Sequence, residues 1–437
     1  MPTPRSIQRT YLLLLLGNTL AASLIWGINT IFLLDAGLSN LEAFAANAFF
    51  TAGMVLFEVP TGIVADTVGR RASYLLGTVT LAATTLLYVL LWQVEAPFWA
   101  WAVVSMLLGL GFTFFSGAVE AWLVDALTAT GFDGNLETVF GRGQVVSGVA
   151  MLAGSVAGGY IAQVTSLGVP FVLRGIVLGI MFAAAFVLMR DVGFTPERGV
   201  GLGRGVSRIS SASIQYGWRV PAVKWLMLAS PFAGGVGIYA FYALQPYLLE
   251  LYGDPDAYGI AGLVAAIVAG AQIVGGLLAP RIRRLFHRRT SGLIGTTAAS
   301  AATLVLIGVW EEFWAALALI VVWGLLFAAA MPIRQAYLNG LIPSQQRATI
   351  LSFDSMLSSS GGVVIQPVLG RSADVWGYPA SYVLGGAISA LAIPFELLSR
   401  RQNAPADVAV GAPAPPVEVT DVAATHPVSC VEADALR

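Results

Sequence analysis

The sequence predicts an all-α integral membrane protein whose twelve transmembrane helices form two pseudo-symmetric six-helix bundles. Three observations support this fold class. Of the 437 residues, 57% are hydrophobic and only 11% are charged, whereas about 25% charged residues is usual in a soluble protein. Twelve apolar stretches are long enough to cross a bilayer, and short patterns recur between the two halves of the chain.

Each apolar stretch approaches or exceeds the roughly 20 residues that a helix needs to cross the hydrocarbon core. The stretches cover residues 10–34, 41–64, 72–93, 98–126, 143–165, 170–189, 223–250, 258–280, 291–310, 313–337, 350–372 and 377–399. Short connections such as 35–40 and 166–169 make consecutive helices antiparallel neighbours. The first stretch is too long for the apolar region of a signal peptide, so we expect it to be retained as a helix.

The longest polar connection divides the chain near its centre. We predict an N-terminal six-helix bundle over residues 1–189, a cytoplasmic central loop over 190–222, a C-terminal six-helix bundle over 223–399 and a disordered cytoplasmic tail over 400–437. The tail is rich in Ala, Pro and Val and cannot form a core.

The positions of the basic residues predict the orientation, because cytoplasmic loops retain Lys and Arg. On the predicted path, 21 of the 23 basic residues lie on the side of the N-terminus. We therefore expect a multi-pass protein of the cell (plasma or cytoplasmic) membrane with both termini in the cytoplasm, which requires an even number of crossings. Only Arg174 and Arg371 fall near the other face. Arg174 is expected to extend outward to the interface, with substrate contact as the alternative.

Composition also excludes several classes of function. A net charge of −1 gives no field that would attract nucleic acid. The single cysteine, Cys430, cannot form an internal disulfide, and the two histidines, His287 and His426, fall in polar segments, so no metal site or cofactor is expected. No nucleotide-binding loop is present. With no His or Cys in any span, an enzyme is not expected.

The two halves share short patterns at a nearly constant offset. Residues 62–65 match 276–279 at an offset of 214, residues 121–123 match 336–338 at 215, and residues 155–158 match 367–370 at 212. Each pattern falls at the end of, or within, the corresponding helix of its half. Duplicated halves around a central site are typical of secondary transporters.

The connection between the second and third stretches carries the most specific motif. It reads Gly62-Ile-Val-Ala-Asp66-Thr-Val-Gly69-Arg70-Arg71. We expect Gly62 to allow close helix approach and Gly69 to give a permissive backbone. This loop resembles the signature loop of the major facilitator superfamily, Gly-x-x-x-Asp-x-x-Gly-Arg-Lys/Arg, at every fixed position, and with the twelve helices the resemblance covers residues 10–399.

The resemblance implies a conformational latch on the cytoplasmic side. Asp66 would meet the start of the eleventh helix near Ile350, where the helix dipole favours an anion. Arg70 would pair with Asp125, and the latch would stabilise the outward-facing state. The alternative is that these charges only anchor the loop to lipid headgroups.

Acidic residues within the spans are costly and need a reason. Glu120, in the fourth stretch, is the main candidate for proton coupling, and a permanent ion pair or hydrogen bond is the equal alternative. Glu58 and Asp354 are further candidates, although their position near the cytoplasmic interface favours a structural role. Arg334 is expected to extend toward that interface.

In the superfamily, the first, fourth, seventh and tenth helices line the cavity. The residues that this implies for substrate contact are amides and aromatics, with helix–helix contact as the alternative for each: Asn18, Trp26, Asn29, Tyr239, Tyr242, Gln245, Trp323 and Gln335. We see no Lys or Arg deep in these helices, so an uncharged or weakly charged amphipathic substrate is expected.

The fifth stretch resembles the antiporter motif of drug-exporting members of the superfamily. Gly154, Ser155, Gly158 and Gly159 fall on the Gly-Pro-x-x-Gly-Gly part of that motif. Ser155 replaces the proline and Ala150 replaces a glycine, which weakens the inference of export.

These observations predict a transporter that works by alternating access and exports a small amphipathic compound, such as an antibiotic or metabolite, in exchange for protons. The alternative is proton-coupled uptake of a nutrient such as a sugar or small organic acid. The expected partners are the small-molecule substrate, protons and the lipid bilayer, and we expect a monomer. An intramembrane enzyme or a receptor is the rival from another class.

Overall fold

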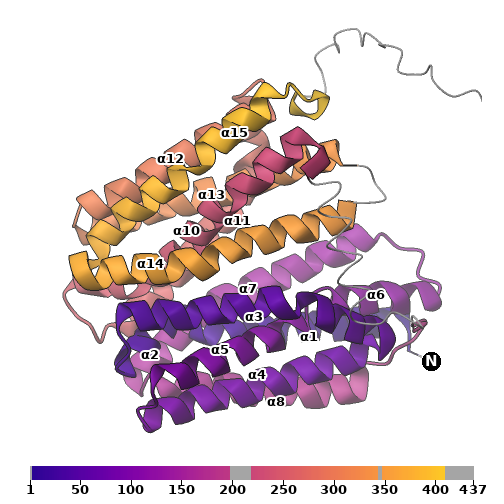
Figure 1. Cartoon of the computed structure of the whole chain (residues 1–437). Coiled ribbons are helices and arrows are strands. Elements are labelled where there is room, and N and C mark those ends of the chain that lie inside the picture. Colours follow the sequence, from indigo (N-terminus) through magenta and orange to yellow (C-terminus); the bar gives the residue numbers. More distant parts are fainter. Residues whose placement is uncertain (1, 197–217, 343–346, 409–437) are drawn as a thin grey trace, which may run out of the picture.

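The computed structural model describes residues 2–196, 218–342 and 347–408, and in these ranges the chain is almost entirely helical. The first half contains α1 (Pro4–Trp26), α2 (Asn29–Asp35), α3 (Asn40–Thr67), α4 (Arg70–Gln93), α5 (Phe98–Thr113), α6 (Ala118–Ala129), α7 (Leu136–Val164) and α8 (Gly168–Leu188). The second half contains α10 (Pro221–Tyr252), α11 (Tyr258–Arg284), α12 (Arg289–Val309), α13 (Phe313–Leu341), α14 (Arg347–Ala390), α15 (Ala392–Arg401) and the short helix η2 (Pro405–Asp407). Figure 1 shows the two halves as adjacent bundles of elongated helices.

Local sequence signals explain where several helices begin. Thr3 before α1 and Ser39 before α3 each form a capping box, with Ser6 and Glu42 respectively. These side chains satisfy backbone N–H groups that have no partner within the helix. Pro221 begins α10, at a position where its missing N–H costs nothing.

Two predicted spans are broken helices. The span 10–34 consists of α1 and α2, interrupted at Gly27 and Ile28, and the span 98–126 consists of α5 and α6, interrupted at residues 114–117. A Cβ atom on Gly27 would lie 2.9 Å from the Cα atom of Gly262 in α11, so the absence of a side chain at Gly27 permits close contact between the halves. Gly117 has a φ of 68°, which glycine adopts without strain.

The element α14 contains two helices joined at a reversal of the chain, and counting them separately brings the number of crossings to twelve. Eleven helices of the described residues are long and apolar enough to span a membrane, and the last of these, Ile350–Arg401, has 52 residues. Within it, Gly377 is non-helical, with a φ of 83°. Ser230 donates to Asp354 on one side of Gly377, and Ser399 donates to the carbonyl of Ala222 on the other. The chain therefore runs along α10 and back again.

Equivalent helices pack in equivalent ways in the two halves. The helix α1 packs on α7 as α10 packs on α14, and α3 packs on α5 as α11 packs on α13. Glycines allow this approach in both halves: a Cβ on Gly53 would overlap the carbonyl of Met106, and one on Gly275 would overlap that of Leu325. Small residues are the usual means of tight helix packing in membranes. The predicted fold class, with two pseudo-symmetric six-helix bundles, is confirmed.

Among the described residues, the hydrogen bonds between the halves concentrate away from the N-terminus. We call the end of the molecule that holds the N-terminus the N-terminal face and the other end the opposite face (Figure 1). At the opposite face, the carboxylate of Asp374 accepts hydrogen bonds from the backbone N–H groups of Asn40 and Leu41, both at 2.9 Å. The hydroxyl of Tyr378 also donates to Asn40. We call Asn40, Asp374 and Tyr378 the opposite-face clasp.

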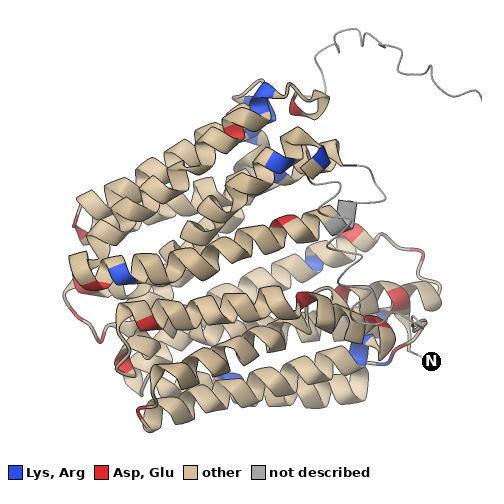
Figure 2. Cartoon of the chain, viewed as in Figure 1, with Lys and Arg blue, Asp and Glu red and all other residues tan. Residues whose placement is uncertain are grey.

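Basic residues gather mainly at the N-terminal face. Figure 2 shows most of the Lys and Arg positions at the end that holds the N-terminus, with acidic positions at both ends. The last described helices return to that same end (Figure 1), as an even number of crossings requires.

The chain remains ordered beyond α15, into the segment predicted to be a disordered tail. The carboxylate of Asp407 is buried and accepts hydrogen bonds from the backbone N–H of Thr290 at 2.7 Å and from its hydroxyl at 2.8 Å. Asp407 thereby accepts a hydrogen bond from a backbone N–H group in the first turn of α12, which has no partner within the helix. The rest of the predicted tail, from residue 409, and most of the predicted central loop lie outside the described residues.

Candidate transport site

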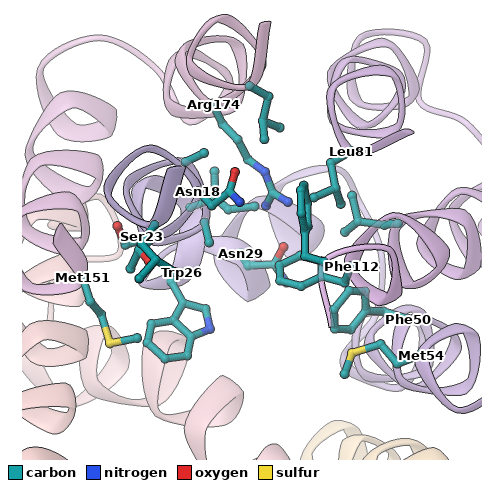
Figure 3. Close-up of a pocket in the computed structure, with 18 of the residues that line it drawn as sticks. Asn18, Ser23, Trp26, Asn29, Phe50, Met54, Leu81, Phe112, Met151 and Arg174 are labelled. Atoms are coloured by element: carbon teal, nitrogen blue, oxygen red, sulfur yellow. The ribbon is translucent and has the colours of Figure 1, made fainter. Parts of the chain in front are cut away.

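A cavity of about 490 Å³ lies mainly among the helices of the first half. Its walls are largely apolar and aromatic, with a few amides and two charged side chains, Glu120 and Arg174. Tyr242 of α10 is the residue of the second half that reaches the wall. Figure 3 shows aromatic, amide and Arg174 side chains around a common space.

Four of the predicted substrate-contact residues line this cavity: Asn18, Trp26, Asn29 and Tyr242. The two asparagines are held by neighbours, because Tyr74 donates to the Oδ1 atom of Asn18 at 2.9 Å and Asn29 donates to Asn47 at 3.0 Å. Trp26 packs against Phe241, with ring centroids 4.8 Å apart. The polar groups of the wall are thus fixed in place.

The other four predicted residues do not line this cavity. Tyr239 is buried and donates to the hydroxyl of Ser381 at 2.6 Å. Trp323 is buried and stacks on Phe327, and Gln335 is exposed outside the cavity. The reason is that the cavity lies almost wholly in the first half, and none of the described residues of the tenth helix, α13, reaches its wall.

Gln245 joins the two halves instead of facing the cavity. Its side-chain carbonyl accepts a hydrogen bond from the backbone N–H of Thr30 at 3.0 Å, and its amide nitrogen donates to the carbonyl of Trp26 at 2.8 Å. Both backbone groups lie at the break between α1 and α2. The break leaves the N–H of Thr30 and the carbonyl of Trp26 without partners within the helix, and Gln245 forms hydrogen bonds with both.

Glu120 lies in the first turn of α6 and lines the cavity with its side chain exposed. The positive end of the helix dipole favours its carboxylate. Glu58 has a different environment, because it accepts a hydrogen bond from the hydroxyl of Ser116 at 2.6 Å and does not line the cavity. Of the three residues predicted to couple protons, Glu120 is the one that lines the cavity, whereas Glu58 and Asp354 do not.

Asp354 forms a largely buried ion pair in the second half. Arg334 donates to both of its carboxylate oxygens, and Ser230 donates to one of them at 3.0 Å. Arg334 also donates to the carbonyl of Leu226 at 3.1 Å. This network links α10, α13 and α14. Arg334 was expected to extend toward the interface, but it points inward because Asp354 compensates its charge.

Arg174 is the clearest departure from the sequence analysis. It was expected to extend outward, yet only 3% of it is exposed and it lines the cavity. Figure 3 shows its side chain pointing from α8 into the pocket. Its guanidinium carbon lies 5.8 Å from the centroid of the Phe112 ring. The hydropathy pattern predicted where Arg174 lies along the helix, but it could not predict the direction in which the side chain points.

The motif at the N-terminal face is partly assembled. Arg70 pairs with Asp66 at 2.5 Å and with Asp125 at 3.9 Å. The predicted pairing with Asp125 is therefore present. Asp66 makes no hydrogen bond or ion pair with the part of α14 whose side chains the structure describes, from Ile350 onward, so its contact with the start of the eleventh helix stays a prediction.

Two glycines of the motif behave differently. Gly69 has a φ of 129°, as its predicted permissive backbone requires, and a Cβ there would lie 2.5 Å from the Oδ2 atom of Asp191. Burial raises the pKa of the Asp191 carboxyl, while a hydrogen bond from the backbone of Arg71 lowers it. A Cβ on Gly62 would meet no atom within 4 Å, so Gly62 does not provide the predicted close helix approach. Arg71 donates to the carbonyl of Phe186 at 2.5 Å.

The motif of the fifth stretch packs α7 against both halves. A Cβ on Gly154 would overlap the hydroxyl of Ser23, and one on Gly158 would overlap the carbonyl of Leu24. A Cβ on Gly159 would lie 2.5 Å from the carbonyl of Tyr258 in α11. Ser155 is buried between them. The glycines thus allow α7 to pack closely against α1 and α11.

Sequence reasoning missed the part of the wall that comes from α3, α4 and α5. Asn47, Phe50, Tyr88 and Phe112 line the cavity. Asn47, Phe50 and Tyr88 sit on α3 and α4, which the resemblance does not assign to the cavity, whereas Phe112 sits on α5, within the fourth span, but was not among the predicted residues. Asn47 is a polar residue in an apolar span, and this signal was available in the sequence.

The comparisons with known proteins agree with the fold. A family model described as Major Facilitator Superfamily matches residues 11–363 and 260–429. A crystal structure of a mutant of the nucleoside transporter NupG is similar with a TM-score of 0.73 at 12% identity, over 90% of this chain and 99% of that one. No curated protein matches significantly.

Two further solved structures are similar over nearly the same length. One is a bacterial homolog of the human lysosomal transporter Spinster, in an inward-facing and unoccupied conformation, with a TM-score of 0.70 and 14% identity over 92% of this chain and 98% of that one. The other is a POT family transporter in complex with 5-aminolevulinic acid, with a TM-score of 0.69 and 14% identity over 92% and 99%. At these identities the likeness concerns the fold alone.

Proposed function

Because this chain belongs to the Major Facilitator Superfamily, we propose that it is a secondary transporter that exports a small amphipathic compound in exchange for protons. The observation that carries the proposal is the cavity of about 490 Å³, whose wall combines aromatic rings, amides and the carboxylate of Glu120. Apolar walls with a few placed polar groups are typical of small-molecule sites. The protein acts in the cell membrane, as a monomer, with both termini in the cytoplasm.

Alternating access gives the two faces opposite roles. The opposite-face clasp holds the halves together at one end, while Asp66 at the other end makes no hydrogen bond or ion pair with α14 from Ile350 onward. With the orientation that the basic residues indicate, this arrangement corresponds to a state open to the cytoplasm. The latch between Asp66 and α14 then forms when the cytoplasmic side closes.

Glu120 is the proton carrier in this proposal. Its carboxylate lines the cavity, its side chain is exposed, and it has no ion-pair partner among the described residues, so a proton that enters the cavity can reach it. One proton that crosses about 100 mV supplies about 2.3 kcal/mol, which supports a substrate gradient of roughly 50-fold. That energy suffices for useful export.

The same cavity would serve proton-coupled uptake of a nutrient, which is the second candidate function. Ser155 and Ala150 favour it, because both depart from the motif of exporting members. The glycines that do match, Gly154, Gly158 and Gly159, pack α7 against α1 and α11. This packing serves either direction of transport.

The experiment that tests the proposal measures transport in inverted and in right-side-out membrane vesicles under an imposed pH gradient. Amphipathic drugs and nutrients are added in turn while a pH-sensitive dye reports the gradient. Discharge by drugs in inverted vesicles supports export. Discharge by nutrients alone, with proton and solute moving together, supports uptake and contradicts export.

The variant Glu120→Gln tests the proton carrier in the same assay. We expect it to abolish discharge of the pH gradient while the protein remains folded in the membrane. The matched control is Glu311→Gln, an exposed residue between α12 and α13. Proton-driven transport that persists in Glu120→Gln would remove Glu120 from this role.

A further inference from the structure

We propose that the transported substrate carries a carboxylate that binds Arg174 inside the cavity. The inference rests on the proposed function, because it treats the cavity as the transport site. It replaces the expectation of an uncharged substrate with a defined chemical class, a small monoanionic organic acid with an apolar body.

Arg174 is buried without a counter-ion. It is 3% exposed, and its Nε atom is buried with no hydrogen-bond partner. Among the described residues it makes no ion pair and no hydrogen bond. Arg334, the other inward-pointing arginine, pairs with Asp354 and donates to Ser230 and Leu226. The contrast indicates that the partner of Arg174 is supplied from outside the chain, since a buried charge is usually compensated.

The surroundings of Arg174 are neutral. Phe112 places its ring near the guanidinium, with the guanidinium carbon 5.8 Å from the centroid, and Tyr88 and Tyr242 line the same cavity. The hydroxyl of Tyr88 is hydrogen-bonded to Ser105. Of the described residues, Glu120 is the one acidic residue in the cavity wall. It lies toward the N-terminal face on α6, whereas Arg174 lies near the start of α8 at the opposite face.

A second donor without a partner lies in the same wall. The side-chain oxygen of Asn47 accepts from Asn29 at 3.0 Å, while the side-chain nitrogen of Asn47 is buried with no partner. Asn47 and Arg174 both line the cavity. Two hydrogen-bond donors without partners favour a ligand that has several hydrogen-bond acceptors. A carboxylate has two acceptor oxygens, and their spacing matches the N–H groups of a guanidinium.

The rest of the wall determines the body of the ligand. Phe50, Met54, Leu81 and Leu108 are apolar, so they favour an aromatic or aliphatic group. One uncompensated positive charge matches one negative charge. The chemistry therefore favours a monocarboxylate over a polyanion such as a nucleotide.

The test compares a carboxylate with its uncharged amide. Purified protein in lipid nanodiscs is titrated with 1-naphthylacetate and with 1-naphthylacetamide, which differ little except in charge. We expect the carboxylate to bind wild-type protein at least about tenfold more tightly. The variant Arg174→Gln should lose this preference through weaker binding of the carboxylate alone, and Arg174→Lys should retain part of it.

The matched control is Arg371→Gln, an exposed arginine at the opposite face, which should keep the preference. Equal binding of the two probes to wild-type protein would overturn the inference, as would a preference that survives in Arg174→Gln. If Arg174→Gln does not fold, the wild-type comparison and Arg174→Lys still decide.

Transport of both probes by proteoliposomes separates this inference from the proposed function. Transport of the two probes at equal rates, unchanged in Arg174→Lys, would contradict the anion site and leave the transporter in place. Binding of the carboxylate through Arg174 without any transport would support the anion site and contradict the proposed function.

Discussion

At the scale of single residues, the two inward-pointing arginines show how burial separates structural from functional charge. Arg334 has its hydrogen-bonding capacity met by Asp354, Ser230 and Leu226. Arg174 makes no ion pair or hydrogen bond among the described residues; it lies near the ring of Phe112 and lines the cavity. A charge that is compensated by the fold stabilises one arrangement of helices. A charge that is not compensated leaves a place for a ligand.

The pair between Arg334 and Asp354 gives the first prediction. Asp354→Asn leaves the guanidinium buried without its counter-charge, which should destabilise the second half by about 3–5 kcal/mol. Thermal or denaturant unfolding in detergent measures the change. Asp133→Asn, in an exposed loop of the first half, should leave the stability unchanged. The double variant Arg334→Met with Asp354→Leu should recover much of the loss, because no buried charge remains; a loss as large as that of Asp354→Asn would contradict this account.

Two glycines provide a second, paired prediction. Gly158→Ala places a methyl group against the carbonyl of Leu24, whereas Gly62→Ala places one where no atom lies within 4 Å. We expect Gly158→Ala to cost about 1–3 kcal/mol of stability through overpacking. Gly62→Ala should be neutral or slightly stabilising, since alanine favours helix. The melting temperatures of the two variants check this, and similar losses in both would contradict it.

Residue positions within the cavity could be predicted only in part. Asn18, Trp26, Asn29 and Tyr242 were expected there and line it. Tyr239, one turn before Tyr242, packs into the core instead. Hydropathy and spacing locate a residue along a helix, but its direction depends on how neighbouring helices pack. For the same reason the sequence could not show that Arg174 points inward.

At the scale of elements, the loop between α3 and α4 should act as a conformational latch. Asp66→Ala removes the carboxylate that pairs with Arg70 in this structure and that meets α14 in the proposed closed state. We expect transport to fall at least about fivefold, which corresponds to a loss of about 1 kcal/mol, with normal amounts of folded protein. Vesicle transport and size-exclusion chromatography measure the two effects. Wild-type transport in Asp66→Ala would contradict the latch.

The opposite-face clasp gives the converse prediction. Asp374→Ala removes the acceptor of two backbone hydrogen bonds at the start of α3. Hydrogen bonds to a charged group contribute about 1.5–3 kcal/mol each, so the population open at the opposite face should rise at least about tenfold. Spin labels at Glu95 and Glu311, on exposed loops of the two halves, report the distance. Asp254→Ala is the control, and an unchanged distance distribution in Asp374→Ala would contradict this role.

The elements themselves were predicted well from the sequence, apart from their interruptions. Twelve spans and a reversal near Gly377 follow from apolar lengths and short connections. The breaks at Gly27 and at residues 114–117 were not predicted, because both lie inside continuous apolar stretches. Gly27 breaks α1 where α11 approaches. That contact comes from the other half of the chain, over 200 residues away.

At the scale of the whole molecule, the symmetric packing explains how two rigid halves could rock. Helix α3 contacts α14, and α7 contacts α11, so each half meets the other through equivalent elements. The glycines of α7, together with Gly262 of α11, bring these helices close without large side chains between them. Such a contact can turn without unpacking either bundle.

A reversible cross-link tests this rocking directly. The chain has a single cysteine, Cys430, so Cys430→Ser gives a background without thiols. Adding Asn40→Cys and Asp374→Cys places two thiols where a backbone N–H and a carboxylate lie 2.9 Å apart. Oxidation should lock the opposite face and reduce transport at least about tenfold, and a reductant should restore it. Each single-cysteine variant serves as the control for oxidation itself.

The location of the lock makes the outcome specific. If the halves rock about the cavity, a bond across the opposite face blocks only the step that opens this face. The cross-linked protein should therefore still bind ligand from the N-terminal face, as titration in nanodiscs would show. Loss of transport with retained binding is the result that rocking requires. Continued transport through an intact cross-link would mean that substrate crosses the bilayer by movements within one bundle, and rocking of the two halves would be rejected.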